Sequence, residues 1–256
     1  MKLGFDPSDT AEAPPRGAMS PLALRRPGAR LGYWTVFVLF TVAVVVAYIG
    51  PLYWLLVGAL KSPKELAATP PTLWPGDPQW GNYDFAWNNL DIAASMTNTM
   101  FYAAGSVIVQ VLVAVTAAFS LSYLRPMFSK PLFSLILVTL FIPGVITFVP
   151  LYATMVRLPL PGTEITLINS PLALWLPAGA NAFNIFLVKR FFDRLPVELI
   201  QSAQIDGANS WQILWHVVLP MSRPILAVIS VFAFIGASTD FLWSLLVLPD
   251  PGKQPL

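Results

Sequence analysis

Long apolar runs alternate with short polar segments along most of this chain. Four uninterrupted runs carry no charged side chain: Leu31–Leu60, Ile92–Leu124, Pro131–Val156 and Ile165–Val188. A fifth run, Pro224–Leu248, carries Asp240 as its one charge. A helix rises about 1.5 Å per residue and the hydrocarbon core of a bilayer is about 30 Å thick, so about 20 apolar residues span it. We therefore predict an all-α membrane protein, a polytopic transmembrane helical bundle with five visible spans.

Composition supports lipid as the solvent of this chain. Hydrophobic residues make up 56% of the sequence and charged residues 11%, whereas a soluble domain carries about 25% charged residues. Helices buried inside a soluble protein are the alternative, but such helices would not give four uninterrupted apolar runs of this length.

The distribution of Lys and Arg predicts the orientation. Residues 1–30 are rich in proline and mixed charge, and we expect a disordered leader there, followed by a transmembrane domain over residues 31–256. If the spans alternate, eleven of the fifteen basic residues share one side and four lie on the other: Lys61, Lys64, Arg157 and Lys253. The positive-inside rule then places the N-terminus in the cytoplasm.

Two features of the runs admit more than one interpretation. Four prolines fall inside apolar runs, at Pro51, Pro143, Pro150 and Pro177. They mark either a broken helical path of the kind found in transporters or ordinary kinked packing. Three tryptophans follow the first run, at Trp74, Trp80 and Trp87. Those side chains serve either as headgroup anchors or in folding the outer loop and contacting a partner.

The polar segment 194–220 is punctuated as two short helices with a corner between them. Pro196 suits a first helical turn, and Asp206-Gly207 is a turn signal in which glycine can take a positive φ. Asn209 can cap a second helix, with Gln212 three residues later reaching back to it.

The second of these helices carries an apolar stripe. Trp211, Leu214, Trp215 and Val218 follow the i, i+3, i+4, i+7 spacing of one helix face, and Pro220 ends the predicted helix. The segment is too polar to span a membrane. It is either a rigid handle for a soluble partner or an interfacial helix pair packed on its own bundle.

The sequence lacks the residue sets that several kinds of functional site require. The sequence has no cysteine and one histidine, His216, which we interpret as a packing or surface residue. It contains no Ser/His/Asp set, paired carboxylates, glycine-rich phosphate loop or basic stripe interleaved with aromatics. We expect no catalytic, metal or cofactor site, no nucleic acid partner and no enzyme activity.

Asp240 is the one charge inside an apolar run. An ionisable residue within the membrane is a functional-site candidate by default. A helix starting at Pro224 has climbed about 24 Å by Asp240, so this carboxylate either forms an intramembrane polar site or meets lipid headgroups.

The segment 194–220 resembles the coupling loop of binding-protein-dependent ABC importer permeases. That motif reads Glu-Ala-Ala, three residues, Gly, nine residues, then a β-branched residue, any residue and Leu-Pro. At matching spacing this chain has Gln201-Ser202-Ala203, Asp206-Gly207-Ala208 and Val217-Val218-Leu219-Pro220, with Gln201 in place of the usual Glu and Ser202 in place of the usual Ala. Scattered features resemble the maltose-type and glycerol-phosphate-type permeases, and the likeness runs from Tyr33 to the last residue.

This resemblance implies a permease subunit that forms half of a translocation pore for a sugar or related solute. Gln201, Ser202, Ala203, Asp206, Gly207 and Ala208 would couple it to cytoplasmic ATPase subunits, which bind the ATP. A second homologous permease and an extracytoplasmic solute-binding protein would complete the system, in the cell membrane of a prokaryote. A polyol or glycerol-phosphate permease, and a membrane enzyme or scaffold, are the alternatives.

The family also implies a sixth span. Its members normally continue beyond the position of Leu256 into another helix, so the resemblance predicts one after the five that the sequence displays.

Overall fold

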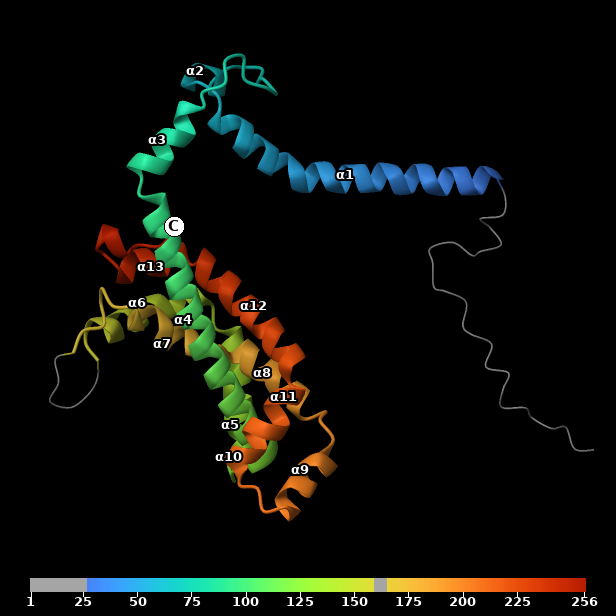
Figure 1. Ribbon diagram of the computed structural model, residues 1–256, viewed down its shortest axis with the longest axis vertical. Helices are drawn as coiled ribbons and strands as arrows, with labels where there is room; N and C mark the ends of the chain where they lie inside the picture. Colours follow the sequence, from blue (N-terminus) through green and yellow to red (C-terminus); the bar gives the residue numbers. More distant parts are fainter. Residues whose placement is uncertain (1–26, 159–164) are drawn as a thin grey trace, which may run out of the picture. The chain divides into compact units, whose positions relative to one another are not determined.

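A computed structural model of the chain describes residues 27–158 and 165–256, and every regular element in those ranges is a helix. The chain divides into two compact units, residues 1–85 and 86–256, whose helices are labelled in Figure 1. The predicted all-α membrane class is confirmed. Most of the predicted leader, residues 1–26, lies outside the described residues, and Pro27 to Arg30 already belong to the first helix.

The first unit is dominated by α1, Pro27–Ala59, a helix of 33 residues that includes Pro51. Nearly all of its large apolar side chains are exposed in the isolated chain. A helix that is apolar on every side is stable in lipid or against other membrane helices, so α1 fits the first predicted span.

A compact turn structure follows α1. The short helix α2, Pro63–Leu66, begins with a capping box between Ser62 and Glu65, and the Gly76 amide donates to Glu65 Oε1 at 2.8 Å. Hydrogen bonds from the Gly76 and Ser62 backbone amides hold the pKa of the Glu65 carboxyl below its ordinary value. Lys61 is buried, donates to the Thr72 carbonyl and lies over the Trp54 ring. The predicted outer loop is therefore internally bonded, while Trp74 and Trp80 remain exposed.

The second unit is built around one long helix. The boundary between the units falls within α3, Gly81–Asn89, and the helix α4 then covers Ile92–Phe119 before widening into a π-helical turn at Ser120–Leu124. The later elements are α5 (Ser129–Val138), α6 (Gly144–Val156), α7 (Leu172–Gly179), α8 (Ala182–Phe192), α9 (Val197–Ile205), α10 (Ser210–Ile213), a π turn (Leu214–Val218), α11 (Leu219–Met221), α12 (Arg223–Thr239) and α13 (Phe241–Val247), with short 3-10 turns at Thr139–Phe141 and Pro251–Lys253. Helices α7, α8 and α12 pack on α4, with α9 and α10 toward one end and α6 and α13 toward the other (Figure 1).

Not every predicted span is one straight helix. In the described residues two helical stretches, Pro27–Ala59 and Ile92–Leu124, are long and apolar enough to cross a membrane alone. Three further helix pairs satisfy the same test together but bend at a break, so the count reaches five when each pair is taken as one span. The runs Pro131–Val156 and Ile165–Val188 correspond to two of these pairs, bent by 108° and 46°.

The breaks have local causes. The predicted run Pro131–Val156 is interrupted where Ile142 and Pro143 leave helical geometry, because proline lacks a donor and disfavours a helical residue before it. The predicted run Pro224–Leu248 is interrupted at Asp240, between α12 and α13. Pro150 and Pro177 stay inside α6 and α7.

Close approach of α4 and α7 depends on one glycine. A Cβ atom at Gly105 would lie 2.1 Å from the Trp175 ring, whose Nε1 donates to the Tyr102 carbonyl at 3.0 Å. Small residues let membrane helices approach closely where packing rather than hydrophobic expulsion drives association.

Candidate functional site

The corner between α9 and α10 is well determined by its own sequence. Gly207 has φ = +80°, and the Ala208 amide donates to the Ala203 carbonyl at 2.9 Å, closing the end of α9. Asn209 Oδ1 accepts from the backbone amide of Gln212 at 2.9 Å, while Gln212 Oε1 accepts from the backbone amide of Asn209 at 2.8 Å. The predicted turn and the reciprocal cap are both confirmed, and they fix the angle at which the two helices meet.

The residues expected to couple to an ATPase divide into two groups. Gln201, Ser202, Asp206 and Gly207 are exposed, whereas Ala203 and Ala208 are half-buried and pack against an apolar cluster that includes Ile200. The corner therefore has one face packed against its own bundle and another face that is exposed. Ile205, 87% exposed, adds a large apolar side chain to the open part.

The second helix differs from its predicted form. Leu214 and Val218 are buried, but Trp211 and Trp215 are exposed and contact each other edge to face at 5.9 Å between ring centroids. The helix widens to π geometry from Leu214, so the four residues of the predicted stripe do not share one buried face. Pro220 does not end the helix, which continues through Met221 before bending by 81° into α12.

A polar network joins the start of this segment to the core helices. Asp193 Oδ1 accepts from Ser122 Oγ at 2.9 Å, and Lys189 Nζ lies 2.8 Å from Asp193 Oδ2. Tyr123 Oη donates to the Phe192 carbonyl at 2.7 Å. The end of α8, from which the corner departs, is thus bonded directly to the end of α4.

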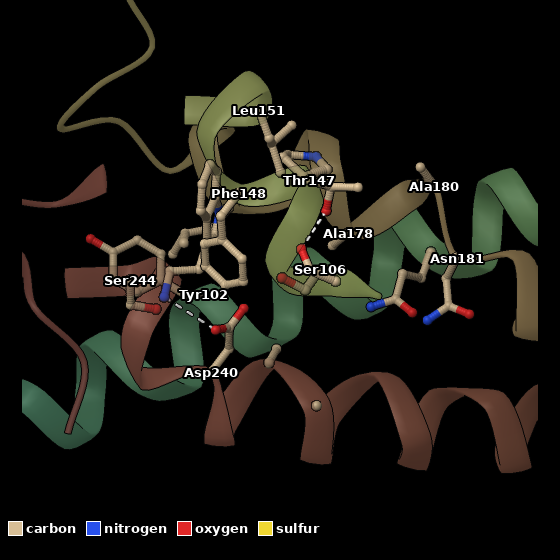
Figure 2. A pocket seen from close by; sticks show the side chains of 17 residues that line it. Tyr102, Ser106, Thr147, Phe148, Leu151, Ala178, Ala180, Asn181, Asp240 and Ser244 are labelled. Carbon is tan, nitrogen blue, oxygen red and sulfur yellow. Dashed lines mark hydrogen bonds between the residues drawn. The ribbon is translucent and has the colours of Figure 1, made fainter. Parts of the chain in front are cut away.

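A second candidate site is a cavity of about 380 Å³ between the helices of the second unit. Its lining comes from α4, α6, α7 with the start of α8, and α12 with α13: Tyr102, Ser106, Gln110, Gly144, Thr147, Phe148, Leu151, Leu174, Pro177, Ala178, Ala180, Asn181, Gly236, Ala237, Asp240, Trp243 and Ser244 (Figure 2). The midpoint of the span Ile92–Leu124 falls at Ile108, within the part of α4 that borders the cavity. Transporters commonly hold their solutes at such a depth.

Amide side chains occupy one end of this cavity. The side chains of Asn184 and Gln110 are both buried, and Asn184 Nδ2 donates to Gln110 Oε1 at 2.8 Å. Asn181 Oδ1 accepts from the backbone amide of Asn184 at 3.0 Å. The bond to Asn184 orients the Gln110 amide, which leaves its Nε2 hydrogens as donors. Polar groups that face a cavity inside a membrane bundle can bind a polar solute in place of water.

Asp240 lies at the other end of the cavity. It stands at the break between α12 and α13, where its Oδ1 accepts from the Trp243 amide at 3.3 Å. Its carboxylate points toward Tyr102 and the interior (Figure 2). The structure does not bring Asp240 together with the coupling residues, which lie at the far end of the unit (Figure 1).

Sequence reasoning missed Ser106, Gln110, Thr147, Asn181 and Ser244. Each is a polar residue within or beside an apolar run, and that was the available signal. His216 is exposed, as expected for a surface residue, and its Nδ1 lies 3.1 Å from the Gln212 carbonyl oxygen. Among the described residues there is no cluster of three or more His, Cys, Asp or Glu side chains that could hold a metal ion.

Comparison with known proteins assigns the chain to one family. The family described as "binding-protein-dependent transport system inner membrane component" matches residues 110–256. The sn-glycerol-3-phosphate transport system permease protein UgpE of Yersinia pestis is 30% identical over 206 residues, covering 78% of this chain and 71% of that protein. The diacetylchitobiose uptake system permease protein NgcG of Streptomyces coelicolor is 29% identical over 221 residues, covering 86% and 70%.

The fold has a counterpart among solved structures. A chain from a bacterial ABC transporter involved in the import of the acidic polysaccharide alginate superimposes with a TM-score of 0.75 at 24% identity, covering 90% of this chain and 79% of that chain. The family consists of transport permeases rather than enzymes. This chain therefore belongs to the binding-protein-dependent inner membrane components: it is a multi-pass permease subunit of an ABC importer.

Proposed function

We propose that the corner formed by Gln201, Ser202, Ala203, Asp206, Gly207 and Ala208 docks on a cytoplasmic ATPase subunit. The observation that carries this proposal is the two-sided character of the corner: Ala203 and Ala208 pack on the bundle, while Gln201, Ser202 and Asp206 are open to a partner. A rigid projection can transmit a rigid-body rotation into the helices that bear it. In this proposal the loop over 194–220 is the coupling element of a transmembrane domain that spans 31–256.

The network around Asp193 supports transmission toward the bundle. The corner leaves α8 beside Asp193, which is hydrogen-bonded to Ser122 at the end of α4, and α4 borders the cavity halfway along its length. A movement imposed on the corner by the ATPase would thus reach the helix that lines the solute path. ATP itself is bound by the partner.

The remaining partners follow from the family. We infer a second homologous permease that completes the pore and an extracytoplasmic solute-binding protein that delivers the solute. The N-terminus lies in the cytoplasm, because that arrangement places eleven of fifteen basic residues on the inner side. The proposed solute is a sugar or a related compound, with a polyol or glycerol phosphate as the alternative.

Two cysteine substitutions test this assignment, since the chain has no native cysteine. Cysteine at Ser210 should react with a membrane-impermeant thiol reagent only from the inner face. Cysteine at Lys64, exposed in the outer loop, should react only from outside. Labelling of both from the same face would overturn the topology.

A third substitution tests the docking itself. Gln201→Cys should cross-link to a co-expressed ATPase subunit through a short bifunctional thiol–amine reagent, whereas Lys64→Cys should not. A membrane enzyme or scaffold would neither co-purify nor cross-link with that subunit.

A further inference from the structure

The cavity has a distinctive chemical lining. It presents hydroxyl groups of Ser106, Thr147 and Ser244, side-chain amides of Gln110 and Asn181, and rings of Tyr102, Phe148 and Trp243. Among the described residues that line it, the one formal charge is the negative charge of Asp240. Hydroxyls and amides can both donate and accept hydrogen bonds, so this lining can replace the hydration of a neutral, hydroxyl-bearing solute.

The carboxylate of Asp240, which is exposed in the isolated chain, is oriented by one hydrogen bond. Its Oδ1 accepts from the Trp243 amide, and the indole of Trp243 is itself fixed because Nε1 donates to the Ala173 carbonyl at 3.0 Å. Trp243 is buried and also meets Phe148 edge to face. The charge therefore lies beside Tyr102 and Ser244 at one end of the cavity (Figure 2).

A charge at this position acts on every solute that enters the cavity. Apolar helices around the cavity lower the effective dielectric constant, so a like charge a few ångströms away is repelled more strongly than in water. We propose that Asp240 is a specificity-determining residue that makes this cavity reject anionic solutes and admit neutral, hydroxyl-bearing ones. This inference rests on the proposed function, in which the solute crosses the bundle here, and it places a phosphate ester on the rejected side.

The test measures the charge selectivity of the cavity without needing the solute. Ala237 lies three residues before Asp240 on α12 and also lines the cavity. Ala237→Cys, in the full chain co-expressed with its partners in permeabilised membranes, is treated with three methanethiosulfonates: one with a sulfonate group, one with a neutral hydroxyethyl group and one with a trimethylammonium group. Each rate is divided by the rate of the same reagent with a small thiol in solution.

We expect the anionic reagent to react at least about tenfold more slowly than the neutral one, because the carboxylate of Asp240 repels it. Adding Asp240→Asn should bring the anionic and neutral rates together, and Asp240→Glu should keep them apart. Asp91→Asn is the matched control, because Asp91 lies outside the cavity and its positive φ of 47° is tolerated by asparagine.

The outcomes separate this inference from the proposed function. Equal anionic and neutral rates with Asp240 present, an unchanged ratio in Asp240→Asn, or a cysteine that reacts with none of the reagents would each overturn the specificity role. None of these rates depends on ATP or on docking. A failed Gln201→Cys cross-link with an intact charge ratio would instead remove the coupling proposal and leave the cavity as an anion-rejecting one.

Discussion

The coupling corner and the cavity are built from sequence in opposite ways. The corner is made of consecutive residues, and its shape follows from contacts no longer than five positions along the chain, such as Ala208 with Ala203 and Asn209 with Gln212. The cavity draws on four separate parts of the chain, from Tyr102 to Ser244. A locally determined element can hold its geometry while the bundle moves, whereas a cavity assembled from many helices changes whenever they rotate. This division suits a device in which a rigid lever acts on a deformable site.

The largest expected effect comes from breaking the packing beside the cavity. Gly105→Leu places a side chain where even a Cβ atom would lie 2.1 Å from the Trp175 ring. That ring is held by its bond to the Tyr102 carbonyl, so α4 and α7 must separate. Overpacking of this kind costs about 1–3 kcal/mol or more. We expect loss of monodisperse protein in size-exclusion chromatography after detergent extraction.

Gly179→Ala is the control, because it adds only a methyl group at another contact between α7 and α4. Its Cβ would lie 3.0 Å from a methyl group of Val109 at the end of a side chain that can shift. Wild-type assembly of Gly105→Leu would show that the α4–α7 contact does not define the cavity.

The next effect comes from the corner. Gly207→Val forces a β-branched residue into φ = +80°, which costs roughly 1–3 kcal/mol of backbone strain. No atom lies within 4 Å of the position that a Cβ would take, so the loss comes from backbone conformation and not from a clash. We expect ATP-coupled uptake in proteoliposomes to be abolished while insertion and yield stay normal.

Gly207→Asn sharpens that result, because asparagine adopts positive φ more readily than other residues with a side chain. We expect it to retain most of the uptake. Equal uptake by the valine and asparagine variants would remove the corner from the coupling pathway.

The corner was also the part best predicted from sequence, for the same physical reason. Gly207 and the Asn209–Gln212 cap encode short-range geometry, and both predictions are confirmed. The exposure of Trp211 and Trp215 was not predictable, because it depends on a π turn and on where α12 leaves the corner.

Among the polar residues that line the cavity, only Asp240 was singled out from the sequence, as either an intramembrane polar site or a headgroup contact, because its charge stands out in an apolar run. Gln110 and Asn184 belong to different runs, and nothing in either run indicates that the two amides meet at 2.8 Å. The runs Pro131–Val156 and Ile165–Val188 carry prolines that are compatible with a broken helix, but the bends of 108° and 46° were not predictable. Hydropathy counts apolar residues along a path and is insensitive to a bend within it.

A smaller effect is expected from the cap of α10. Asn209→Ala removes the acceptor of the Gln212 amide, and loss of such a cap costs about 1 kcal/mol. The variant should keep partial uptake and show a lower melting temperature in a detergent thermal-shift assay. Asn209→Ser, which retains a capping oxygen, should fall between Asn209→Ala and wild type, and an order reversed between these variants would contradict the capping role.

The smallest expected effect is the loss of stability when an ion pair at either end of the second unit is removed. Lys189 bonds Asp193 at 2.8 Å with side chains 15% and 30% exposed, and it lies over the Phe133 ring. Lys253 is 4.0 Å from Asp250, and both side chains are nearly half exposed, so solvent screens that pair more strongly. Lys189→Met should lower stability by about 0.5 kcal/mol at low salt, with a smaller loss at high salt, and Lys253→Met by less. Thermal-shift measurements at two ionic strengths would decide. If Lys253→Met lowered stability more than Lys189→Met, the expected order of the two ion pairs would be wrong.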